Sequence, residues 1–111
     1  MTSAKNIITA RQLATAAAVL YSAPAQTSCV LKKLTFSNTT GAAVTVTVYL
    51  VAPGGTVGDA NTLHKARSVD PLDVYECVEA VNHVLSPGAS VQALASVGLA
   101  ITVIGSGIET N

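Results

Sequence analysis

The sequence predicts an all-β protein that folds as a single antiparallel β-sandwich or jelly-roll-like domain of about seven to eight strands with an N-terminal arm. Apolar and polar residues alternate in several short runs, and turn-forming residues separate these runs at short intervals. The chain of 111 residues is long enough for one modest core but too short for two. We expect the arm to span residues 1–17 and the sandwich to span residues 18–111.

The clearest strand is Val44–Val51. Its even positions are apolar and its odd positions are amphipathic: Val44, Val46, Val48 and Leu50 against Thr45, Thr47 and Tyr49. Side chains alternate between the two faces of a strand, so this pattern predicts a half-buried strand with its valines directed into the core. β-Branched residues at most positions disfavour a helix.

Further strands are predicted by weaker forms of the same pattern. They are Ala18–Ser22, Ser28–Asn38, Leu63–Val69, Val74–Val78, Ala80–Leu85, Ser90–Val97 and Leu99–Ile104. In the second of these, Val30, Leu34 and Phe36 share a face that Lys32 interrupts, which indicates a β-bulge. In the last two, we expect the inward residues to be Val91, Ala93, Ala95, Val97, Leu99, Ile101 and Val103.

Turn residues divide these runs. Asn38–Gly41 (NTTG) is typical of a hairpin connection, with Gly41 able to adopt a positive φ. A longer loop is expected at Pro53–Ala60, and shorter turns at Asp70–Asp73 and Ser86–Ala89. Gly105–Gly107 (GSG) is expected to loosen the end of the last strand.

The N-terminal segment has two interpretations. Thr9–Leu20 is rich in alanine, which favours a helix, but its apolar spacing is poor. Residues 1–12 carry little apolar surface and are expected to form an extended arm. We expect Ile7 and Ile8 to anchor this arm on a neighbouring subunit.

Composition and charge narrow the function classes. Half of the residues are apolar, but only 11% are charged, and six basic side chains balance six acidic ones. Such a chain creates no long-range field for nucleic acid or an anionic membrane, so we expect neither as a partner. A neutral surface of low charge suits close packing against other copies or a scaffold. On this basis Thr45, Thr47 and Tyr49 are the expected contacts of the central strand with a neighbour.

Two segments resemble membrane or export signals. Ala14–Ala25 has an apolar run followed by small residues, but the run is short and Arg11 limits it, so we expect no secretory signal. Val97–Gly107 is far too short to span a bilayer. Cys29 and Cys77 lack any CxxC spacing. Two buried thiols in a reducing cytoplasm are favoured, and a single disulfide is the alternative.

No residue pattern indicates catalysis, so we expect a protein without enzymatic activity, cofactor or metal. His64 and His83 are 19 residues apart and have no ligand cluster beside them. Cys77 is flanked by Glu76 and Glu79, which would oppose rather than favour formation of a thiolate. The aspartates lack the spacing of a calcium loop, the glycines lack the lysine of a phosphate loop, and the single basic pair lacks aromatic neighbours.

Four segments together resemble small virion structural proteins of tailed bacteriophages. They are LYSAPAQTSCVLKKLTFSNTTGAAVTVTVYLVAPGG, GDANTLHKA, VNHVLSPGASVQALAS and LAITVIGSGIE, within about residues 20–109. The resemblance implies a β-sandwich or jelly roll that decorates capsids or builds tail and fibre parts. His64–Arg67 and the two cysteines depart from the family's pattern.

The resemblance implies a virion protein assembled in the host cytoplasm, and in first place a decoration or cement protein that bridges capsid subunits. Its implied partners are the major capsid protein or other virion proteins, and further copies of itself as a dimer or trimer. The alternatives are a tail or head-fibre component and a receptor- or carbohydrate-binding module. The last is disfavoured because sugar sites usually use an aromatic platform, and the chain has three tyrosines and no tryptophan.

Overall fold

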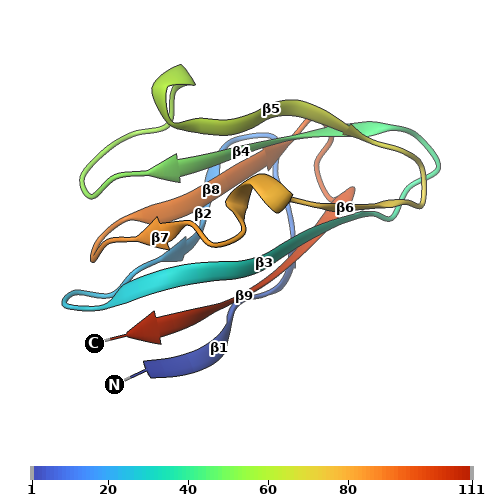
Figure 1. Ribbon diagram of the computed structural model, residues 1–111. Coiled ribbons are helices and arrows are strands. Elements are labelled where there is room, and N and C mark those ends of the chain that lie inside the picture. Colours follow the sequence, from blue (N-terminus) through green and yellow to red (C-terminus); the bar gives the residue numbers. More distant parts are fainter. Residues whose placement is uncertain (1, 111) are drawn as a thin grey trace.

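Two antiparallel sheets face one another in the computed structural model, which describes residues 2–110 except for the side chain of Glu79 (Figure 1). Met1 and Asn111, which the expected domain boundaries include, lie outside the described residues. Sheet A contains β1 (Thr2–Gln12), β9 (Ile101–Thr110), β3 (Ser28–Asn38), β6 (Val74–Glu76) and β7 (Val84–Leu85). Sheet B contains β2 (Ala18–Ser22), β8 (Ser90–Ala95), β4 (Val44–Val51) and β5 (Thr62–Val69). The all-β sandwich expected from the sequence is confirmed.

The strand order is that of a jelly roll. The strand orders are β1-β9-β3-β6 in sheet A and β2-β8-β4-β5 in sheet B, so the first strand pairs with the last and the second with the last but one. β4 and β5 form the innermost pair, and β3 pairs with both β6 and β7. The short 3₁₀ helix η2 (Val78–Ala80) separates β6 from β7, which therefore occupy one edge position of the sheet between them. Such nested antiparallel pairing defines the double-sheet jelly roll.

The core between the sheets is aliphatic. β4 buries Val44, Val46 and Val48, as the alternation predicted. The neighbouring strand β8 buries Val91, Ala93 and Ala95 on the same side of the sheet. Sheet A contributes Leu31, Leu34, Phe36, Ile101 and Val103. Small side chains on β8 leave room for the larger ones opposite, as close packing requires.

The predicted bulge in β3 is present. Its pairing with β9 shifts register between Leu31 and Lys33. The shift places Cys29 and Leu31 on the inner face before the bulge, and Leu34 and Phe36 after it. Val30, which was expected inward, instead lies on the outer face.

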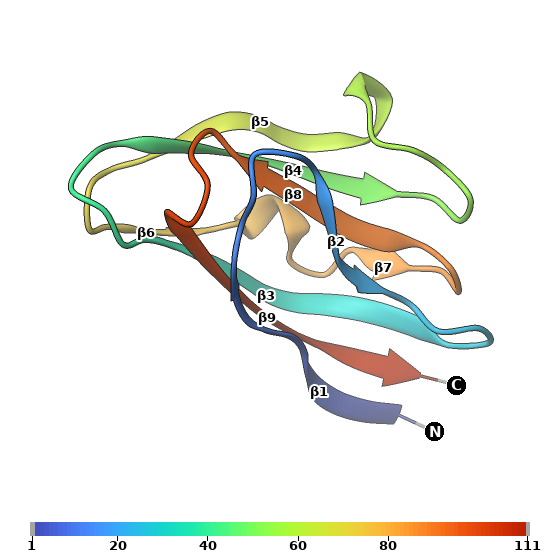
Figure 2. The ribbon, with the colours of Figure 1, turned by 180° about the vertical axis from the view of Figure 1, so that it is seen from behind.

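The expected N-terminal arm is corrected for residues 2–12, which form the edge strand β1 of sheet A. β1 pairs with β9 from Thr2↔Thr110 to Gln12↔Thr102, and the chain then crosses to sheet B and begins β2 (Figure 2). Ile8 is only 1% exposed and belongs to the core of its own chain. Register shifts on either side of Ile8 break the alternation, so the segment does not have a strand pattern in sequence. The helix considered for Thr9–Leu20 is not formed.

Gly105 and Gly107 do not loosen β9, which continues through them to Thr110. A Cβ atom on Gly107 would lie 2.7 Å from the carbonyl oxygen of Val30, and one on Gly105 would lie 2.9 Å from Cδ1 of Ile8. The glycines therefore allow β1 and β3 to pack closely against the strand between them.

The NTTG segment is not a hairpin, because it carries the chain from β3 in sheet A to β4 in sheet B. Gly41 does not adopt a positive φ. The buried amide of Asn38 organises this crossover: its Nδ2 donates to the carbonyls of Ala42 (2.7 Å) and Val69 (3.0 Å), and its Oδ1 accepts from the N–H of Thr40 (3.0 Å). One side chain thus ties the β3–β4 loop to the end of β5, where the chain begins its return to sheet A.

Three further predicted segments differ. The strand expected at Ala80–Leu85 is reduced to β7, because η2 and a turn precede it. Val97 and Leu99 are exposed in the β8–β9 loop instead of buried, since Ser96 ends β8 by exchanging hydrogen bonds with Thr45. Leu99 has a positive φ of 58°.

Candidate assembly surfaces

A polar cluster joins the two sheets at one end of the sandwich. The hydroxyl of Tyr21, on β2, donates a hydrogen bond to Oε2 of Glu109, on β9. Nζ of Lys5, on β1, lies 2.7 Å from the other carboxylate oxygen. The hydrogen bond from Lys5, and then that from Tyr21, lower the pKa of Glu109 below its usual range. The cluster therefore holds three strands from both sheets together and has its donors and acceptors matched.

Burial changes the pKa values of Tyr21, within this cluster, and of Cys29, beside it. The pKa of Tyr21 is raised strongly, first by burial and then by its bond to the Glu109 carboxylate, so the hydroxyl stays protonated. Burial also raises the pKa of the Cys29 thiol, although the nearby hydroxyl of Tyr21 partly opposes this. A thiol with a raised pKa is a poor nucleophile. The cluster is suited to structural cohesion.

The His64–Arg67 segment forms a second cluster at the opposite edge. A register shift in β5 lies between the pairs Val46↔Arg67 and Val48↔His64, and Ala66 within it has a φ of 54°. The extra residue places both side chains on Tyr75 of β6: the Arg67 guanidinium lies 4.6 Å above its ring centre, and His64 Nδ1 lies 3.4 Å from its hydroxyl. The motif thus closes the edge between β5 and β6.

Potential reactive groups are dispersed. Among residues 2–110, with the side chain of Glu79 left aside, no three His, Cys, Asp or Glu side chains gather as a metal site would require. Cys29 and Cys77 are both buried thiols. Within the same described part of the chain, no helix is long and apolar enough to cross a membrane.

The structure separates the five expected assembly contacts into two groups. Thr45 and Tyr49 lie partly exposed on the outer face of sheet B. Thr47 is only 7% exposed, because the N–H of Ala66 donates to its hydroxyl at 2.9 Å in the β5 bulge. Ile7 is partly buried against the core and Ile8 is buried within it, so Ile8 has no surface to offer a neighbour.

An apolar surface that the sequence did not predict covers the outer side of sheet A. Register places four residues of four strands in one row across the sheet: Ala4, Ile108, Val30 and Val84. Two further side chains, Ile104 and Val74, lie on the same side two and three rows away, beyond the row that contains Lys33 and Ser106. We call these six residues the apolar face. Because these residues are far apart in sequence, no local pattern groups them. The apolar residues at the outward positions of β9 were the sequence signal that could have revealed this surface.

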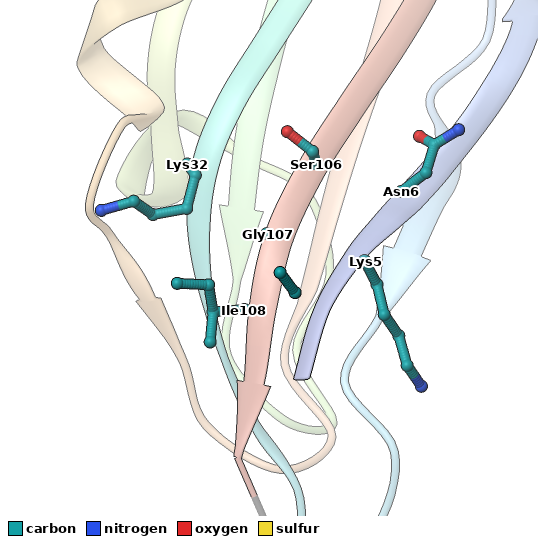
Figure 3. Close-up of a pocket in the computed structure, with 7 residues that line it drawn as sticks. Lys5, Asn6, Lys32, Ser106, Gly107 and Ile108 are labelled. Atoms are coloured by element: carbon teal, nitrogen blue, oxygen red, sulfur yellow. The ribbon is translucent and has the colours of Figure 1, made fainter. Parts of the chain in front are cut away.

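A shallow groove of 390 Å³ runs beside the apolar row, between β1, β9 and β3 (Figure 3). Ala4, Ser106 and Ile108 contribute to its lining. Lys5 and Lys32 flank it, but their amino groups point away to either side (Figure 3), toward Glu109 and toward Asn82 Oδ1 at 2.9 Å. Because both ammonium groups already have partners within the chain, the groove offers little to an anionic ligand.

Comparison with known proteins shows the fold and no family. No protein family matches the chain, and no curated protein is similar to it in sequence. A chain in the structure of infectious bursal disease virus, Gx strain, matches 98% of this chain with a TM-score of 0.53 and 13% identity. A chain of the Gt strain of that virus matches the same share with a TM-score of 0.44 and 12% identity. This protein spans only 32% and 30% of those chains, and at such identity the Gx match shows a shared fold alone.

Proposed function

We propose that this chain is a structural protein of a virion, and specifically a decoration or cement protein of a tailed bacteriophage that stabilises the head by bridging capsid subunits. It has no enzymatic role, binds neither nucleic acid nor membrane, and needs no cofactor. It assembles in the host cytoplasm and acts in the particle. Its partners are the major capsid protein and further copies of itself.

The observation that carries the proposal is the complete jelly-roll pairing over the whole described chain. Jelly rolls recur in viral capsids, and the Gx-strain match extends over 98% of this chain. The low charge supports the same proposal, since 11% charged residues with no net charge limit repulsion between crowded copies. Fold alone does not define function, so the proposal also draws on the phage resemblance of residues 20–109.

Two faces of the sandwich are available for assembly. Thr45 and Tyr49 present a neutral, hydrogen-bonding surface on sheet B, and we assign them to the capsid contact. Ile8 and Thr47 do not belong to this contact, because both are buried. A carbohydrate-binding role has little support, since the ring of Tyr75 is stacked on Phe36 and the hydroxyl of Tyr21 is bound to Glu109.

Copy number in purified particles tests the proposal. Quantitative mass spectrometry should find this chain in a fixed ratio to the major capsid protein, at hundreds of copies per head. A handful of copies would indicate the alternative, a tail or head-fibre component. Absence from purified particles would refute both virion roles.

A functional test follows from the cement role. Particles lacking the chain should release their genome at a lower temperature, and adding the purified chain should restore the original release temperature. Added Thr45→Lys/Tyr49→Lys protein should bind less, whereas Val57→Lys, an exposed change in the β4–β5 loop, should bind normally. Equal binding by both variants would remove sheet B from the capsid contact.

A further inference from the structure

The two outer faces of the sandwich differ in kind. On sheet A, Val74, Val84 and Ile104 are 57%, 64% and 46% exposed although they belong to regular strands. The outer side of sheet B instead presents Thr45, Tyr49 and other polar groups, with one exposed valine, Val19, on its edge strand. Single exposed apolar side chains are ordinary, but a row of apolar residues that crosses four strands, as Ala4, Ile108, Val30 and Val84 do, marks an interaction surface.

Two of the open edges, β1 and β5, are poorly suited to assembly. β1 carries two register shifts and the charged residues Lys5 and Arg11. β5 carries the bulge at Ala66 between Lys65 and Arg67. Bulges and basic side chains are the features that prevent edge-to-edge pairing with another chain. These features favour association through a face of the sandwich over pairing along β1 or β5.

From these features we infer that two copies of this chain associate through the outer side of sheet A, with the apolar face of one packed on that of the other about a two-fold axis. The inference specifies the self-assembly within the proposed function. The partner that covers this face is a second copy of the chain, because the face can pair with itself, as a two-fold interface requires.

Charge supplies the first argument for a second copy. Lys33 and Glu76 lie on this side of sheet A, 3.6 Å apart and both about half exposed. A two-fold axis brings the face against its own inverted copy, so each basic group can meet the acidic group of the other copy. A surface that carries both signs beside its apolar row thus meets no like-charge barrier in pairing with itself.

Area supplies the second argument. Three strands of ten or eleven residues about 4.8 Å apart, with the short β6 and β7 beside them, give sheet A a projected outer area of roughly 550 Å². The accessible area of a corrugated side-chain surface exceeds its projection. One face can therefore provide the ~800 Å² per partner that a stable dimer of standard size buries.

Sedimentation velocity of the purified chain over a wide concentration range tests the inference. The wild-type chain should show a monomer–dimer equilibrium. Val84→Lys should raise the dimer dissociation constant by about tenfold or more, because it places a charge within the apolar row. Val19→Lys, the same substitution at a similarly exposed strand position of sheet B, should leave it unchanged. Circular dichroism establishes that both variants are folded.

A charge exchange tests the geometry independently of apolar contact. Lys33→Glu should weaken the dimer, and the double variant Lys33→Glu/Glu76→Lys should restore its dissociation constant. A wild-type chain that is monomeric at every concentration would overturn the inference. So would a dimer that is equally sensitive to Val84→Lys and Val19→Lys, or a double variant without restored affinity.

These experiments distinguish a failure of the proposed dimer interface from a failure of the proposed virion role. A monomer that binds particles would refute the interface and leave the proposed function standing. A dimer formed as described but absent from particles would refute the proposed function and leave the interface standing.

Discussion

The carboxylate of Glu109 accepts a hydrogen bond from the hydroxyl of Tyr21, and this bond links the last strand of sheet A to the first strand of sheet B. The two residues are 88 positions apart in sequence. The contact therefore forms only when both sheets are in place, and Lys5 completes it from β1.

This linkage predicts how stability depends on acid. The pKa of Glu109 is lower in the folded chain than in the unfolded chain, so its carboxylate stabilises the fold above the usual glutamate pKa. That stabilisation is lost as pH falls through the lowered value. Glu109→Gln should therefore be less stable than wild type at pH 7, and the difference should shrink below about pH 4. Urea unfolding at a series of pH values measures this. Parallel pH profiles for the two proteins would contradict the prediction.

Alkali should act through Tyr21. Its pKa is raised in the folded chain, so the protonated hydroxyl stabilises the fold below the usual tyrosine pKa of about 10. Above that pH the stabilisation declines as the unfolded chain ionises. Tyr21→Phe should flatten this alkaline decline in urea unfolding, because it removes the ionising group. An unchanged decline in Tyr21→Phe would show that other groups cause it.

Gly107→Ala should destabilise the fold by about 1–3 kcal/mol, as overpacking of a filled core does. Its new Cβ would lie 2.7 Å from the backbone oxygen of Val30 and 3.0 Å from Sγ of Cys29. Gly41→Ala is the control, since nothing lies within 4 Å of the corresponding Cβ. The midpoints of denaturant unfolding compare the two variants. Equal midpoints would mean that β1 and β3 can move away from β9 at little cost.

Asn38→Ala should lower the unfolding free energy by about 1–3 kcal/mol, because it leaves the carbonyls of Ala42 and Val69 without this donor. Lys32→Ala is the control: Lys32 is exposed on β3 and donates a hydrogen bond to Oδ1 of Asn82. Chemical denaturation should separate the two variants clearly. If Asn38→Ala behaved like Lys32→Ala, the crossover would not depend on this amide.

Val48→Asp should abolish soluble folding, since it buries a carboxylate in an aliphatic core without a partner. Val97→Asp should be tolerated, because the side chain is 50% exposed in the β8–β9 loop. Alternation along the sequence assigned both valines to the core. Soluble yield and thermal melting of the two variants therefore test the structure against that assignment. Folded Val48→Asp protein would place β4 in the wrong register.

The bounds of β4, β2 and β3 were predicted from the sequence, most directly in β4, where Val44, Val46 and Val48 alternate into the core. The bulge in β3 was predictable as well, since Lys32 stands where an apolar residue was due. β1 was not predictable. Its period breaks twice at bulges, and its buried isoleucines pack against glycines, which contribute no apolar signal of their own.

The assembly surfaces were harder to predict, because they depend on which strands become neighbours. Val84, Val30 and Ile108 lie in one row only through the pairing of β7 with β3 and of β3 with β9. The threonine face of β4 was predicted correctly in its direction. The burial of Thr47 depends on Ala66 in the β5 bulge, which no local pattern around β4 reveals.

The pairing of Thr2 with Thr110 has a consequence for engineering. The two residues are register partners, and their hydroxyl oxygens lie 3.3 Å apart. A short peptide linker can therefore join these two positions, and the chain can be reopened in the exposed β4–β5 loop to give a circular permutant of the same sandwich. A peptide or enzyme attached at either original end leaves the molecule from a single corner. In an array of copies, the attached peptides or enzymes would therefore lie together in a single layer.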